Sequence, residues 1–201
     1  YIVCTNVSKQ TADVLSYETT PHLTIKEAVR MSMGIPIFFA AIRNEQNEII
    51  VDGAVTWNYP INIFDNIKYL DNPENGIKVD YNTDQDYVFN HETLGFRVDS
   101  LNEIDYSKND WQTEPMKVKN IKQFVVALMN FTMEMVNKKH LHKNDWNRTV
   151  FVDSLNVQTT QFSLSKQQIV DLIQSGKVAV DNYFTWKKND LKDGILPKKA
   201  M

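Results

Sequence analysis

The stretch EIIVDGAVTWNYP, Glu48 to Pro60, constrains the fold more than any other part of the sequence. Three β-branched apolar residues run directly into Asp52 and Gly53, and the small residue Ala54 follows. Such residues favour a buried strand, and Asp-Gly is a common turn dipeptide. The pattern therefore predicts a strand that ends at Asp52, with a sharp turn after it.

A capped helix and a hairpin are predicted ahead of this turn. Thr24 and Glu27 form the T-x-x-E pattern of a capping box, which satisfies backbone amides at a helix start. The helix ends before Pro36, because proline lacks an amide proton and clashes with the preceding turn. Residues 36–42 and 48–52 are predicted as short strands, joined by a polar loop that ends in an asparagine.

The C-terminal half carries two longer helical patterns. Over residues 119–138, apolar side chains recur every third or fourth position. This stripe is interpreted as core-facing, with a lipid or partner surface as the alternative. A second helix begins at a capping box of Ser165 and Gln168, and Gly176 is expected to end it in a left-handed cap. A strand over 148–154 lies between the two helices.

The segment 65–118 differs in composition, because it is polar and rich in Asn and Asp, with aromatic residues scattered through it. This composition predicts an irregular excursion over the surface. Acidic and amide residues alternate from Asp80 to Asp86 as at the start of a calcium loop, but Gln85 and His91 stand where that loop needs Gly and Glu. A solvated loop is the better interpretation, and no metal site is predicted.

Composition and charge exclude several classes of function. The formal net charge of −3 does not indicate the positively charged surface that nucleic-acid-binding proteins need. No apolar run reaches the roughly 18 residues that would span a membrane. The single cysteine, Cys4, excludes an internal disulfide and favours a reducing, cytoplasmic compartment. No G-x-G-x-x-G or Walker sequence occurs, so no nucleotide cofactor is predicted. The histidines are not expected to act as bases; they are His22, His91, His140 and His142.

These elements, taken in order, closely resemble the patatin-like phospholipase family. In that family a helix of the form A-x-x-A-S-x-x-x-P-x-x-F precedes a strand that ends in Asp-Gly-Gly or Asp-Gly-Ala, followed by N-x-P. The matching residues here are Ala28, Ser32, Pro36, Phe39, Asp52, Gly53, Ala54, Asn58 and Pro60. Met31 and Met33 flank Ser32, where smaller residues are common in the family. This difference concerns the packing of the helix more than the chemistry. The resemblance covers most of the chain except the stretch near 66–85.

The resemblance implies an α/β fold, a three-layer patatin-like α/β/α hydrolase of which residues 1–201 form the C-terminal portion of a single domain. Within it, 1–64 would form a block of sheet, helix and Asp-Gly-Ala motif. Residues 65–118 would form the irregular excursion, and 119–201 the helical C-terminal part. The chain opens inside a predicted strand without an initiator Met, and we interpret it as part of a longer chain.

The resemblance also implies a lipid acyl hydrolase of phospholipase A or lysophospholipase type with a Ser–Asp dyad. Asp52 is the implied catalytic residue, and Gly53 and Ala54 complete its motif. No G-x-S-x-G occurs in the 201 residues, so the serine is expected upstream and the isolated chain is expected to be inactive. The implied substrate is a phospholipid or lysophospholipid, met by transient contact with a membrane surface from a cytoplasmic, peripheral location. No metal or other cofactor is implied.

The residues themselves suit this role. A carboxylate at a strand end is held by the sheet rather than by a mobile loop, and as a base Asp52 would need a pKa raised by partial burial. Gly53 is expected to adopt a backbone conformation that turns the chain. Ala54 is expected to let a neighbouring element approach closely.

Two other interpretations remain open from the sequence. The first is a non-catalytic lipid-binding or effector-interaction module on the patatin scaffold, with Asp52 as a turn former, because a fold does not fix a function. The second is a chance motif match in an unassigned α/β domain. An intact upstream G-x-S-x-G would favour the enzyme over the module.

Overall fold

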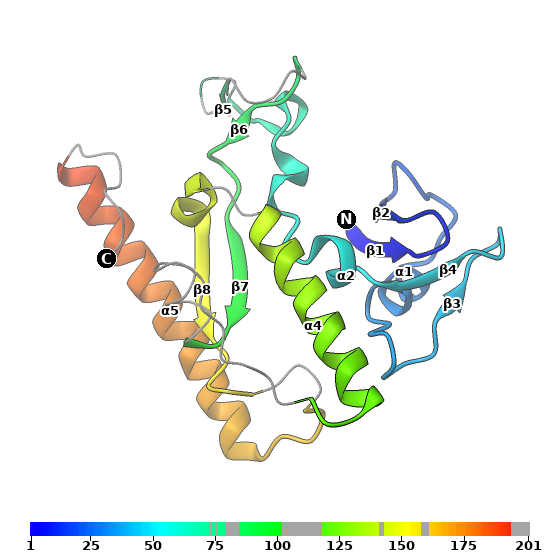
Figure 1. The fold of residues 1–201 in the computed structure, drawn as a ribbon. Helices are drawn as coiled ribbons and strands as arrows, with labels where there is room; N and C mark the ends of the chain where they lie inside the picture. The colour runs from blue at the N-terminus through cyan, green and yellow to red at the C-terminus, as the bar shows by residue number, and fades with distance from the viewer. Residues whose placement is uncertain are drawn as a thin grey trace. The chain divides into compact units, whose positions relative to one another are not determined.

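The computed structural model describes residues 1–72, 74, 76–78, 85–101, 118–140, 143–157 and 161–193. The chain divides into two compact units, one made of Tyr1–Pro60 with Met116–His142 and the other of Ile61–Pro115 with Lys143–Met201. Strands and helices alternate along both (Figure 1), so the predicted α/β class is confirmed. The assignment of all residues to a single domain stays a prediction.

A four-stranded antiparallel sheet in the order β2-β1-β4-β3 organises the first unit. Its central strand β1 pairs with β2 on one side and β4 on the other, and β1 is buried from Val3 to Asn6. In the register of β1 and β4, Cys4 lies opposite Asp52. The strands are β1 Ile2–Asn6, β2 Thr11–Leu15, β3 Ile42–Arg43 and β4 Ile49–Asp52.

Helix α1, Ile25–Ser32, has the predicted capping box. The Thr24 hydroxyl accepts from the Glu27 amide at 3.3 Å, and the Glu27 carboxylate accepts from the Thr24 amide at 3.1 Å. Ala28 is the buried residue of the helix and joins the core cluster of Cys4, Leu15 and Ile50. The helix is therefore fixed by its cap at one end and by this apolar contact with the sheet.

The strand predicted over 36–42 was wrong for all but its last residue. The chain turns there, with the Phe39 amide donating to the Ile35 carbonyl at 3.0 Å and Ile37 at a φ of 76°. A left-handed residue interrupts the extended backbone that a strand requires. The β3–β4 hairpin loop is as predicted, because Asn47 adopts a φ of 63° and the Asn44 amide donates to the Glu48 carbonyl at 3.1 Å.

Glu48 holds the start of β4 against the two hairpin loops. Its carboxylate accepts from Asn6 at 2.9 Å and Asn44 at 2.8 Å, and Lys9 lies 2.9 Å away. The contacts with Lys9, Asn44 and Asn6 lower the pKa of Glu48 to about 2. Because the folded pKa is below the unfolded one, this stabilisation is present at neutral pH and is lost as the pH falls toward 2.

Two helices complete the first unit, α2 Ala54–Trp57 and α4 Ile121–His140, and they pack against each other. The helix predicted over 119–138 is confirmed, and Asn120 caps it by accepting from the Gln123 amide at 2.9 Å. Its apolar stripe was predicted to face the core, and this was wrong for most of the described side chains, although Val136 is partly buried. The exposed ones are Ile121, Phe124, Val125, Leu128, Phe131 and Met135.

The described residues of the second unit form two small sheets and a long helix. Strands β5 and β6 pair antiparallel, β7 and β8 pair parallel, and α5 packs against β8. Within the described part of this unit, short 3-10 helices occupy Ile61–Phe64, Ile67–Tyr69 and Lys143–Arg148. The other elements are β5 Gly76–Ile77, β6 Phe89–Asn90, β7 Gly95–Asp99, β8 Thr149–Asp153 and α5 Lys166–Asp193.

Two sequence predictions differ from the second unit as observed. Residues 65–118 were expected to run irregularly over the surface, but Asp65, Phe89 and Asn90 are buried and three short strands form. The capping box of α5 is confirmed, yet Gly176 does not end the helix. The adjacent Ser175 donates to the Asp153 carbonyl at 2.8 Å, which holds this turn against β8 and favours continuation of the helix.

Within the described ranges, no helix has both the length and the apolar character needed to cross a membrane.

Candidate functional site around Asp52

Asp52 is held at the end of β4 by the C-terminal end of α1 and the residues that follow it. Its amide donates to the Gly34 carbonyl at 3.1 Å, and the Gly53 amide donates to the Ser32 carbonyl at 3.3 Å. Carbonyls at a helix C-terminus lack intrahelical partners, so the strand end satisfies groups that the helix leaves open. These two backbone hydrogen bonds explain why the helix and the Asp-Gly pair occur together in the sequence.

Two threonines fix Asp52 from the other side. The buried Thr5 hydroxyl donates to the Asp52 carbonyl at 2.8 Å and lies 2.8 Å from the Thr56 hydroxyl. Because the single Thr5 proton is used on the carbonyl, Thr56 is the donor to Thr5. Sequence reasoning missed both residues. Their contacts depend on the pairing of β1 with β4, which brings together Thr5 and Asp52, 47 residues apart in the sequence.

The Asp52 carboxylate is half-buried and has one described hydrogen bond. Its Oδ1 accepts from the Ala54 amide at 2.8 Å, while Oδ2 has no hydrogen-bond partner in the described part of the chain. Burial raises the pKa of Asp52, and the Ala54 amide opposes this by stabilising the charged form. A rigidly placed carboxylate with a raised pKa and an open oxygen is suited to accept a proton.

Gly53 is required for a reason other than the predicted one. Its backbone is right-handed helical, with φ −64° and ψ −27°, so any residue could adopt it. A side chain is excluded by space instead, because a Cβ there would overlap the Val3 carbonyl oxygen and lie 2.7 Å from the Val3 carbonyl carbon. The close approach predicted for Ala54 is thus made at Gly53, and Ala54 begins α2.

Replacing Gly53 with Ala is expected to destabilise the protein by about 1–3 kcal/mol, because β1 must move away from the added methyl. Gly34→Ala is the matched control. A Cβ at Gly34 would meet its nearest neighbour at an ordinary 3.6 Å, so this variant should unfold close to wild type. Chemical denaturation compares the two. Equal midpoints for the two variants would contradict the close-approach account.

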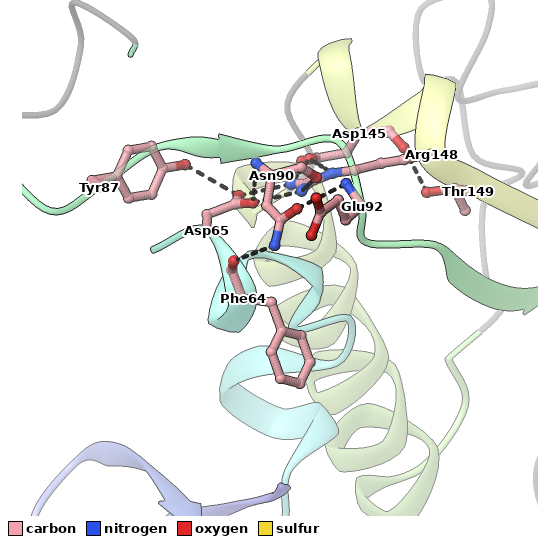
Figure 2. Close-up of polar contacts among 8 residues, drawn as sticks. All are labelled: Phe64, Asp65, Tyr87, Asn90, Glu92, Asp145, Arg148 and Thr149. Carbon is pink, nitrogen blue, oxygen red and sulfur yellow. Dashed lines mark hydrogen bonds and ion pairs between the residues drawn. The ribbon is translucent and has the colours of Figure 1, made fainter. Parts of the chain in front are cut away.

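A second polar cluster lies in the other unit and centres on Arg148 (Figure 2). Its guanidinium contacts Asp65 at 2.5 and 2.7 Å and Asp145 at 2.7 Å, and it donates to the Asn90 carbonyl at 2.9 Å. Burial lowers the pKa of Arg148, but the hydrogen bonds to the two carboxylates outweigh it, so the pKa is raised. The centroid of the Phe89 ring lies 4.0 Å from the guanidinium carbon of Arg148. Figure 2 shows the side chains of Asp65, Asp145 and Arg148 converging on one another, which indicates a structural ion-pair cluster.

Among the residues that the structure describes, no hydrogen bond or ion pair joins the Asp52 side chain to a histidine. Burial lowers the pKa of His91, and the positive charges of Arg148 and Lys187 lower it further, so the neutral imidazole is favoured. His142 and the acidic run at 80–84 lie outside the described residues. Among the residues that are described, no cluster of three metal-binding side chains occurs.

Comparison with known proteins gives a family for the segment that carries Asp52. Residues 2–65 match the model of the patatin-like phospholipase family. A protein described as a probable lipid hydrolase, from Invertebrate iridescent virus 6, is 38% identical over 80 residues, 40% of this chain and 26% of the viral protein. An uncharacterized protein of Acanthamoeba polyphaga mimivirus is 26% identical over 152 residues, 70% of this chain and 49% of that protein.

The chain thus spans about half or less of the curated relatives it matches. Among solved structures, VipD from Legionella pneumophila aligns with 90% of this chain and 30% of its own, at a TM-score of 0.46 and 18% identity. The family match includes β1, α1 and the whole Asp-Gly-Ala turn. The match of residues 2–65 to the patatin-like phospholipase family model confirms the resemblance that the sequence indicated.

Proposed function

We propose that Asp52 is the acid–base partner of a serine nucleophile in a lipid acyl hydrolase of phospholipase A or lysophospholipase type. The observation that carries this proposal is the geometry of the carboxylate. Asp52 is half-buried, its backbone is fixed from both sides, and its Oδ2 is open among the described residues. The family match over residues 2–65 and the viral relative described as a probable lipid hydrolase support the choice of substrate.

In the proposed reaction, Asp52 accepts the proton of the serine hydroxyl as the serine oxygen attacks the acyl carbon of a lipid ester. The protonated Asp52 then donates to the departing alcohol, and an acyl-enzyme remains. In the second half, Asp52 accepts a proton from water as the water oxygen attacks the acyl carbon. Asp52 then returns this proton to the serine oxygen as the acyl–serine bond breaks and the fatty acid leaves. The Ala54 amide holds Oδ1 throughout and so directs Oδ2 to the proton.

The serine is proposed to lie outside these 201 residues, because they contain no G-x-S-x-G elbow. On this proposal the 201 residues alone should not hydrolyse esters. The substrate would be a phospholipid or lysophospholipid at a membrane surface that the protein contacts transiently from the cytoplasm. The test is hydrolysis of phosphatidylcholine and lysophosphatidylcholine by protein that carries the serine segment. Hydrolysis of neither lipid ester would contradict the proposal.

The pH dependence of kcat/KM is expected to follow the ionisation of the Asp52 carboxylate. Only the ionised carboxylate accepts a proton, and burial raises the pKa of Asp52. Activity should therefore fall on acidification with a midpoint above the usual aspartate value of about 3.9. A pH profile with a soluble ester measures this midpoint. An acidic midpoint at or below the usual value would argue against Asp52 as the base.

The alternative function is a lipid-binding module without catalysis. The exposed apolar side chains of α4 favour it, because they give the chain a surface for lipid that does not involve Asp52. In that case Asp52 acts as a turn former through its bond to the Ala54 amide. Lipid binding without ester hydrolysis, by protein with an intact serine elbow, would support the module over the enzyme.

A further inference from the structure

The two peptide groups that follow Asp52 are each held at both ends. In the first, the Asp52 carbonyl accepts from the Thr5 hydroxyl at 2.8 Å. The amide of the same peptide, that of Gly53, donates to the Ser32 carbonyl at 3.3 Å. In the second, the Gly53 carbonyl accepts from amides of α2 at 2.8 and 3.2 Å, and the Ala54 amide donates to Asp52 Oδ1 at 2.8 Å. The direction of the Ala54 amide, and with it that of the carboxylate, therefore depends on the peptide that Thr5 holds.

The Thr5 hydroxyl is not needed to align β1 with β4. The two strands are already aligned over three residue pairs, which end with Cys4 opposite Asp52. Valine, which is also β-branched, would pack in a buried strand as well as threonine does. It would also avoid the cost of burying a hydroxyl, which is offset only when that hydroxyl is hydrogen-bonded. What threonine adds at position 5 is a donor for the Asp52 carbonyl.

Thr56 orients this donor. The Thr5 and Thr56 hydroxyl oxygens lie 2.8 Å apart, and Thr56 donates to Thr5 because the Thr5 proton is used on the Asp52 carbonyl. A hydroxyl proton can rotate, and the bond from Thr56 occupies an acceptor position of the Thr5 oxygen and so favours one direction. Thr5 is 3% exposed, so water has little access to these bonds. A chain of hydroxyls thus runs from α2 through β1 to the end of β4.

We infer that Thr5 and Thr56 are positioning residues for Asp52, which hold its carboxylate at the angle from which Oδ2 takes the serine proton. The inference deepens the proposed function and rests on it for the role of Asp52. Neither threonine has to touch the lipid or the proton. A misplacement of about 1 Å at a reacting group costs about 100-fold in rate, so a small shift of this peptide should be visible in kcat.

A purely structural role predicts a different result. Each threonine would then contribute only stability, and its loss would leave the kcat of the folded protein unchanged. Thr149 provides the matched case, because it is 2% exposed and its hydroxyl donates to the Asp145 carbonyl at 2.6 Å. It lies in the other unit. Thr149→Val therefore removes the same kind of bond from the same kind of environment, away from Asp52.

The hydrolysis of a soluble ester tests the inference in protein that carries the serine segment. Thr5→Val should lower kcat at least about tenfold with KM nearly unchanged, because Asp52 shifts and no contact with the substrate is lost. Thr5→Ser keeps the donor and should stay within about threefold of wild type. Thr149→Val should keep the wild-type kcat. Chemical denaturation checks that each variant is folded in the assay.

Two results of this comparison would overturn the inference. The first is an equal kcat for Thr5→Val and Thr149→Val. The second is a Thr5→Ser variant as slow as Thr5→Val, since the hydroxyl would then not be the group that matters. If Thr5→Val does not fold, Thr56→Val decides, because it leaves the bond from Thr5 to Asp52 in place and removes only the group that orients it. Thr56→Val should lower kcat at least about threefold, and a wild-type kcat would overturn the inference.

Combination with Asp52→Asn shows whether Thr5 acts through Asp52. Once the side chain at position 52 no longer accepts a proton, its orientation ceases to matter. Adding Thr5→Val should therefore slow Asp52→Asn by less than about twofold, and an undiminished tenfold loss would overturn the inference. Full activity in Asp52→Asn would contradict the proposed function and the inference with it. An inactive Asp52→Asn beside a fully active Thr5→Val would overturn the inference alone.

Discussion

Replacing Asp52 with Asn is expected to lower kcat for lipid ester hydrolysis at least about 100-fold in protein that carries the serine segment. The Asn oxygen can still accept from the Ala54 amide, so the turn after β4 is retained. The amide nitrogen cannot take a proton from the serine hydroxyl. The KM should change little, because no contact with the lipid is removed.

The matched control is Asp13→Asn, which neutralises another partly buried carboxylate of the same sheet. It should keep nearly full activity. The fold of Asp52→Asn should also survive. Burial raises the pKa of Asp52, so the protonated form favours the folded state, and that stability is lost as pH rises through the folded pKa. A neutral Asn removes this penalty at pH 7. Full activity in Asp52→Asn would exclude the dyad.

Replacing Arg148 with Met is expected to destabilise the second unit by about 3–5 kcal/mol, the largest loss of stability that we predict. The guanidinium lies between two buried carboxylates, on Asp65 and Asp145, and bonds to both. Without it, two buried negative charges face each other in an environment that water does not reach. Chemical denaturation followed by far-ultraviolet circular dichroism measures the loss.

Arg43→Met is the matched control for Arg148. The Arg43 side chain is exposed and donates to the Asn47 carbonyl at 2.9 Å, so its removal should change stability by less than about 1 kcal/mol. Adding Asp65→Asn to Arg148→Met should restore part of the stability, because it removes one of the two buried charges. A change below about 1 kcal/mol in Arg148→Met itself would show that the cluster does not hold the unit together.

Local sequence signals predicted the elements that local hydrogen bonds define. The capping boxes at Thr24 and Ser165 were both confirmed, because the side chain and the amide it satisfies are three residues apart. Asn47 marked its hairpin loop for a similar reason, as asparagine tolerates a left-handed backbone. The strand ending at Asp52 followed from a run of β-branched residues.

Contacts between residues that are distant in sequence could not be predicted. The Asp65–Arg148 pair joins residues 83 positions apart, and the polar composition around Asp65 pointed to the surface rather than to a buried cluster. Gly176 resembled a helix end, because only packing on β8 distinguishes a continued helix from a capped one. The requirement for glycine at position 53 was predicted, but its cause, the approach of Val3, depends on the fold.

The most direct test of the dyad is the rate at which a fluorophosphonate modifies the serine, followed by intact mass. In protein that carries the serine segment, we predict a single adduct for wild type and labelling at least about tenfold slower for Asp52→Asn. The 201 residues alone, 23.4 kDa, should take no adduct. Labelling of Asp52→Asn at the wild-type rate would show that the serine is activated without Asp52, and it would contradict the account.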